Sequence, residues 1–161
     1  MSKLMKCALA ASMALASMQP AQACWNNDAQ EAATIAKLNM MLMVTGLRCR
    51  NGADNFLPQY NRFVISNNNV LGSQHAALKS YFAQTMGAKG AEGAFDRLVI
   101  DFANGYGAGH PTMGCPELKA LATDLASHSN SIVTLLAVAE RAVGKADVPG
   151  NACVIARLAS K

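Results

Sequence analysis

The longest apolar stretch of the chain predicts one helix over residues 28–50. Between Lys37 and Arg48, Asn39 is its only strongly polar residue. The apolar residues fall on two stripes at helical spacing, the first made of Ile35, Leu38, Met41, Leu42 and Thr45 and the second of Ala36, Met40, Met43, Val44 and Leu47. A helix that is apolar on several sides is buried on several sides. We therefore expect residues 28–50 to form the central helix of a domain.

Apolar residues at helical spacing recur along the rest of the chain. We expect a short helix capped by Asp54, with Pro58 near its first turn, and a break at the asparagines of 67–69. Further helices are expected over 71–86, 94–104, 116–128 and 132–143, with a flexible glycine link at 87–93 and a turn at 129–131. The pattern predicts an all-α, single-domain bundle of five to six helices.

The first 23 residues have the features of a secretory signal peptide. Lys3 and Lys6 precede an apolar run that is too short to span a bilayer, which needs about 20 residues. Cleavage after Ala23 leaves a helical domain of residues 24–161 that begins with Cys24. A cysteine there raises the question of lipidation, but the residues before it match a lipidation signal poorly. We expect a periplasmic or secreted protein with no membrane span after cleavage.

The charged residues change this picture little. The net charge is +4 for the whole chain and about +2 once Lys3 and Lys6 are removed. The charges are interspersed rather than gathered in runs of one sign. Nucleic acid and acidic surfaces are therefore not expected as partners.

Four cysteines remain after cleavage: Cys24, Cys49, Cys115 and Cys153. Four cysteines in an exported chain predict two disulfides, with three possible pairings. A continuous helix over 28–50 separates Cys24 from Cys49 by more than about 30 Å, whereas a disulfide needs Cα atoms within about 7 Å. Following the chain through the bundle favours Cys49–Cys115 with Cys24–Cys153. The alternative is Cys24–Cys115 with Cys49–Cys153.

The longest predicted loop, residues 105–115, is rich in glycine. It lacks the strand, the helix directly after it and the second βα unit of a dinucleotide site, so no cofactor is expected. Loops held by a scaffold often carry function, and tyrosine is enriched at binding hot spots. Tyr106 and His110 are therefore the candidate contact residues. In the alternative, Tyr106 points inward, because it follows Phe102 by four residues.

No catalytic or metal-binding motif is present in the sequence: it has no HExxH, CxxC or G-x-S-x-G. His75 lies on the apolar stripe of the third helix and is expected to be a hydrogen-bonded core histidine. Asp124 and His128 are four residues apart, where they can share a proton or where His128 simply complements a helix end. The methionines at 40, 41 and 43 are expected to be core residues rather than copper ligands.

Several short segments share a further pattern. They are Cys24-Trp25, residues 41–49 (MLMVTGLRC), Tyr60-Asn61 with Phe63, Phe95-Asp96, Ala103-Asn104 and Cys115. Together they resemble a group of small exported four-cysteine helical proteins of Gram-negative bacteria, a group of unknown function. The resemblance covers about residues 24–115. It implies the leader and the disulfides, and it implies no active-site residue.

These observations favour an exported, non-enzymatic helical protein that binds a protein partner in the cell envelope or a small apolar ligand. The alternative is a small envelope enzyme with an acid–base pair near the glycine-rich loop, drawn from His110, Asp101 and Asp124. A cleft that holds His110 beside a carboxylate would favour the enzyme, and an exposed apolar patch would favour a partner. The sequence leaves the oligomeric state open.

Overall fold

The structure is a computed structural model that describes residues 27–128 and 131–146. These residues form six helices and no strand, as the helical spacing predicts. The helices are α1 (Asn27–Cys49), α2 (Leu57–Ser66), α3 (Asn68–Met86), α4 (Ala88–Gly105), α5 (Cys115–His128) and α6 (Ile132–Val143).

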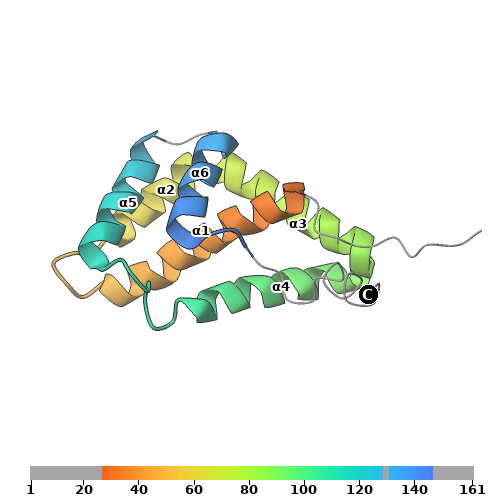
Figure 1. The fold of residues 1–161 in the computed structure, drawn as a ribbon, viewed down its shortest axis with the longest axis horizontal. Coiled ribbons are helices and arrows are strands. Elements are labelled where there is room, and N and C mark those ends of the chain that lie inside the picture. Colours follow the sequence, from red (N-terminus) through yellow and green to blue (C-terminus); the bar gives the residue numbers. More distant parts are fainter. Residues whose placement is uncertain (1–26, 129–130, 147–161) are drawn as a thin grey trace, which may run out of the picture.

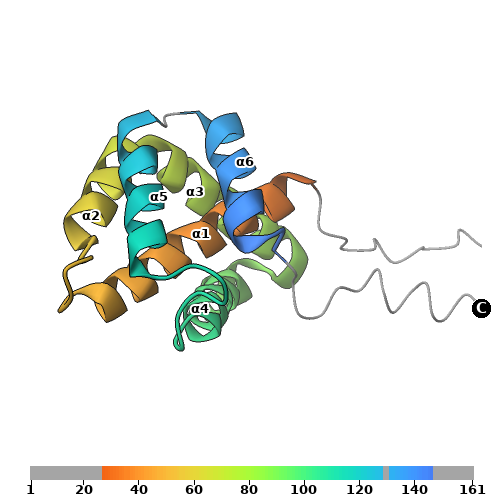
Figure 2. The same cartoon turned by 60° about the vertical axis from the view of Figure 1, so that its left-hand side comes forward.

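The predicted central helix is confirmed, since α1 contacts all of the other helices. Figures 1 and 2 show it crossing the molecule, with α2, α5 and α6 on one side and α4 on the other. The first apolar stripe of α1 is fully buried, each member being at most 1 % exposed: Ile35, Leu38, Met41, Leu42 and Thr45. The second stripe is only partly buried, and Leu47 at its end is exposed.

The core has two parts that share α1. One part joins α1 to α2, α5 and α6 around Phe56, Phe63 and Leu135. The other joins α1 to α3 and α4 around Leu78 and Phe82. A groove between the helices of the second part is where the candidate site lies.

The start of α4 corrects the prediction for this segment. The expected flexible link over 87–93 is wrong, because α4 begins at Ala88 and only Gly87 interrupts the helices. Gly87 has φ 78° and ψ 159°, a conformation that favours glycine, whereas Gly90 and Gly93 lie inside α4. Glycine in a helix costs only about 1 kcal/mol relative to alanine, which the burial of the apolar residues of α4 outweighs.

The boundaries of α2 differ from the prediction in two smaller ways. Asp54 is not its cap; instead the Asn55 Oδ1 accepts a hydrogen bond from the Leu57 N–H at 3.0 Å. The asparagine break is confirmed at Asn67, but α3 begins directly after it, at Asn68, rather than at residue 71. The buried Asn67 amide donates to the Phe63 carbonyl at 2.9 Å and so closes the end of α2.

A disulfide joins Cys49 at the end of α1 to Cys115 at the start of α5, with Cα atoms 5.8 Å apart. This is the favoured pairing for these two cysteines, and it excludes Cys24–Cys49 and the alternative set. Cys24 and Cys153 lie outside the described residues.

Candidate functional site

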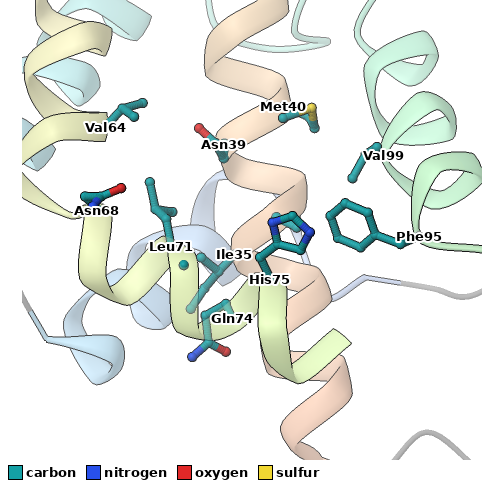
Figure 3. A pocket seen from close by; sticks show the side chains of 12 residues that line it. Ile35, Asn39, Met40, Val64, Asn68, Leu71, Gln74, His75, Phe95 and Val99 are labelled. Atoms are coloured by element: carbon teal, nitrogen blue, oxygen red, sulfur yellow. The ribbon is translucent and has the colours of Figure 1, made fainter. Parts of the chain in front are cut away.

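A largely apolar pocket of about 390 Å³ opens between α1, α3 and α4, with α2 at one edge (Figure 3). Its apolar lining comes from all four helices: Ile35, Ala36, Met40, Val64, Leu71, Phe95 and Val99. Its polar lining is Asn39, Asn68, Gln74 and His75. Ala36 and Met40 of the second α1 stripe are only partly buried here, where they line the pocket and pack at the edge of the core shared with α3 and α4.

The mouth of the pocket is formed by exposed residues of α3, among them Asn68, Gly72 and His75. The His75 ring stacks on the Phe95 ring of α4, with centroids 4.1 Å apart and planes 5° from parallel. The two rings face each other across the helices in Figure 3. The prediction of a core His75 is therefore wrong, and it is the neighbouring Gln74 that is buried.

Asn39 lies on the wall that α1 contributes to this pocket. The Tyr60 hydroxyl on α2 donates to its side-chain Oδ1 at 3.2 Å. Burial raises the pKa of the Tyr60 phenol, so the hydroxyl keeps the proton that this hydrogen bond needs. The bond sets the orientation of the amide, because only its oxygen accepts.

The predicted contact loop lies elsewhere, between α4 and α5, and is fastened to the rest of the protein. Arg48 donates to the Gly107 carbonyl at 2.6 Å, and the Glu117 carboxylate accepts from the Gly114 N–H at 3.0 Å. Tyr106 is only 8 % exposed and belongs to the core around α1, so the inward alternative describes it. Its ring lies 5.9 Å from that of His110. A partner contact at this loop stays a prediction, and Tyr106 has little exposed surface with which to make it.

His110 uses both of its ring nitrogens in hydrogen bonds to the backbone. Nδ1 accepts from the N–H groups of Thr112 and Met113, at 3.2 and 3.0 Å. Nε2 therefore carries the ring proton and donates to the Ala142 carbonyl of α6 at 2.9 Å. In this arrangement His110 fastens the loop to α6.

The proposed acid–base residues are only partly brought together. Asp101 and His110 line one pocket of about 530 Å³ together with Lys37. Asp124 is on the exposed face of α5, where its carboxylate lies 3.1 Å from the His128 ring in a surface pair. A base needs a free nitrogen within reach of its substrate, and both nitrogens of His110 are already bonded. An acid–base role for these three residues stays a prediction.

Within residues 27–128 and 131–146, no group of three or more His, Cys, Asp or Glu side chains is placed to hold a metal ion. None of the six described helices is long and apolar enough to cross a membrane. Among the methionines, Met41 is fully buried and Met40 lines the apolar pocket.

Comparison with known proteins adds no relative. No family model, no curated protein and no solved structure matches this chain. The function has to be inferred from the residues themselves.

Sequence reasoning did not find the pocket, although two of its residues carry a signal. Asn39 stands out as the one polar residue in an apolar run, but the sequence does not show that Tyr60 lies beside it. Gly72 interrupts an otherwise ordinary helical pattern without ending the helix. Both are positions where local preference and the observed structure disagree, and such positions often mark a site.

Proposed function

We propose that this protein is an exported, non-enzymatic helical protein that binds a small apolar ligand in the pocket between α1, α3 and α4. Ligand pockets in proteins usually measure about 300–1,000 Å³ and have apolar walls with a few polar groups. The pocket has about 390 Å³, and most of its lining is apolar. The exposed residues at its mouth give a ligand a path from solvent.

The observation that carries this proposal is Gly72 at the mouth. It lies in the second turn of α3, and a Cβ added there would meet no atom within 4 Å. Neither a turn nor a close approach of another chain segment requires glycine at this position. Glycine in a helix costs about 1 kcal/mol relative to alanine. The absence of a side chain keeps the mouth open, which is of use to a protein that admits a ligand.

The two alternatives have less support. A protein partner at the 105–115 loop depends on Tyr106, which is buried, and the most exposed large apolar residues, Ile65 and Val133, lie on different helices. The enzyme depends on His110, whose nitrogens are bonded to the backbone.

Export is part of the proposal. Cleavage after Ala23, as its signal-like residues suggest, gives a periplasmic or secreted protein, in line with the resemblance to exported four-cysteine proteins. We place a second disulfide between Cys24 and Cys153, the two cysteines that Cys49–Cys115 leaves over. The Ala146 N–H donates to the Thr34 hydroxyl of α1 at 3.0 Å, so the chain after α6 returns to the first half of α1. A disulfide at Cys24 also removes the thiol that lipidation needs.

The test compares two substitutions at Gly72. In an NMR titration of the wild-type protein with α-methylstyrene, we expect saturable shifts at amides around the pocket, such as those of Ala36 and Leu71. Gly72→Phe fills the mouth and is expected to abolish these shifts. Gly72→Ala is the matched control: it keeps the binding and raises the free energy of unfolding by about 0.5–1 kcal/mol.

Two results contradict the proposal. One is a wild-type titration without saturable shifts at the pocket up to the solubility limit of the probe. The other is a folded Gly72→Phe protein that binds the probe as tightly as the wild type does.

A further inference from the structure

The wall of the pocket contains a hydrogen-bond donor that the fold does not use. Asn39 is part of an otherwise apolar run of α1, and its Oδ1 is taken by the Tyr60 hydroxyl. Within the part of the chain that the structure describes, its Nδ2 donates to no other side chain or carbonyl. Asn39 lines the pocket, and the two N–H groups of its amide are free to bind a ligand.

The Asn39 Nδ2 is not one of the buried polar atoms without a partner, so water or a ligand can reach it. If the hydrogen bond between Tyr60 and Asn39 served the fold alone, a side chain with only an acceptor would suffice at position 39. An amide brings two donors in addition, and the bond from Tyr60 holds its oxygen side, so that the nitrogen side is left for a ligand. The rest of the lining is apolar, apart from Asn68 and Gln74 of α3 and the stacked rings of His75 and Phe95 at one side.

We infer that the pocket selects small apolar molecules that carry one hydrogen-bond-accepting oxygen, such as an aryl or alkyl ketone, and that Asn39 is the group that recognises this oxygen. The inference rests on the proposed function, because it names the class of ligand for the same pocket. Tyr60 is a positioning residue: it touches Asn39 and fixes which end of the amide a ligand meets.

Acetophenone and α-methylstyrene form a matched pair of probes. They share size, planarity and the phenyl ring, and differ in a carbonyl oxygen against a methylene group. Since the two differ in their hydration, the informative quantity is how a substitution changes the ratio of their dissociation constants. The same NMR titration measures both probes.

Asn39→Leu is expected to weaken the binding of acetophenone about tenfold, the effect of losing one hydrogen bond of ordinary strength. The affinity for α-methylstyrene should be unchanged or higher, since this part of the wall becomes apolar.

Tyr60→Phe keeps Asn39 but frees its oxygen to turn toward the ligand. We expect it to lower the preference for acetophenone severalfold, with α-methylstyrene unaffected.

The outcomes separate this inference from the proposed function. If α-methylstyrene binds the wild type, but Asn39→Leu changes both affinities by the same factor, Asn39 only holds α2 and the inference is overturned. If neither probe binds the wild type, the proposed function itself fails. Should Asn39→Leu not fold, Tyr60→Phe decides alone: an unchanged ratio in that protein overturns the inference.

Discussion

At the scale of single residues, Tyr106 shows the difference between a predicted contact residue and a core residue. It was the main candidate for contact with a partner in the 105–115 loop. It is 8 % exposed and packs in the core around α1, and burial raises the pKa of its phenol. We expect Tyr106→Ala to lower the free energy of unfolding by about 2–4 kcal/mol, as large-to-small core substitutions do. Chemical denaturation followed by circular dichroism measures this loss.

Tyr106→Phe is the matched control, since it keeps the ring and removes only the hydroxyl, and its cost should stay below about 1 kcal/mol. Tyr106 does not line the pocket of Asn39, so α-methylstyrene binding to the folded Tyr106→Ala protein should be unchanged. A melting temperature equal to that of the wild type would instead show that the ring serves a partner and not the core.

Residue patterns predicted part of these environments. The four-residue spacing from Phe102 correctly gave Tyr106 an inward alternative, because neighbouring turns of one helix share a face. The same reasoning failed for His75, whose place on the stripe with Leu78 and Phe82 suggested burial. Periodicity finds the face of a helix but not its exposed edge, and here the pocket leaves that edge uncovered while Gln74 turns toward the core.

At the scale of helices, glycines with equal appearance in the sequence have different roles. Gly87 has a positive φ and separates α3 from α4, whereas Gly72 has room for a Cβ inside α3. We expect Gly87→Ala to destabilise the protein by about 1–3 kcal/mol, the cost of a strained backbone. Gly72→Ala should have the opposite sign.

Comparing the denaturation midpoints of the two alanine variants checks this contrast. Each replaces glycine by alanine in or next to the same helix, so composition and method are matched. If Gly87→Ala were as stable as the wild type, the positive φ at Gly87 would not be needed to join α3 to α4.

Most helices were predictable because their buried faces carry apolar residues at helical spacing. The bounds of α1 were predicted to within one residue at each end. The start of α4 was missed because the sequence shows three glycines over 87–93 but not which of them takes a positive φ. That choice is made by packing: Ala91 and Ala94 are buried in the core part shared with α1 and α3.

At the scale of the whole molecule, the pocket follows from how the five shorter helices of the described residues pack around α1. α1 is apolar on more sides than its neighbours cover completely, and its partly covered side around Ala36 and Met40 becomes the pocket wall. No local sequence pattern predicts this pocket. It results from the small side chains at Gly72 and Ala36 and from the paths of α1, α3 and α4. Fold class was therefore readable from the sequence, and the candidate site was not.

The closure of the chain is the last prediction at this scale. The predicted mature chain has four cysteines, and Cys49 and Cys115 are joined to each other. Within this chain, Cys24 can therefore pair only with Cys153. Ala146 is bonded to Thr34, which lies about 10 Å along the helix from Asn27 at 1.5 Å per residue. Seven residues from Ala146 to Cys153 reach at most about 25 Å, which is enough to return to Cys24.

Peptide mapping of the exported protein under non-reducing conditions should find Cys24 linked to Cys153. On the chain-entropy model, a bridge that closes almost the whole mature chain contributes about 5 kcal/mol, so replacing both cysteines by serine should lower the melting temperature clearly. The double variant should still bind α-methylstyrene, because both cysteines lie outside the residues that line the pocket. Two free thiols, or a lipid on Cys24, would contradict the bridge and leave the tail held to α1 by the Ala146–Thr34 hydrogen bond and the burial of Ala146.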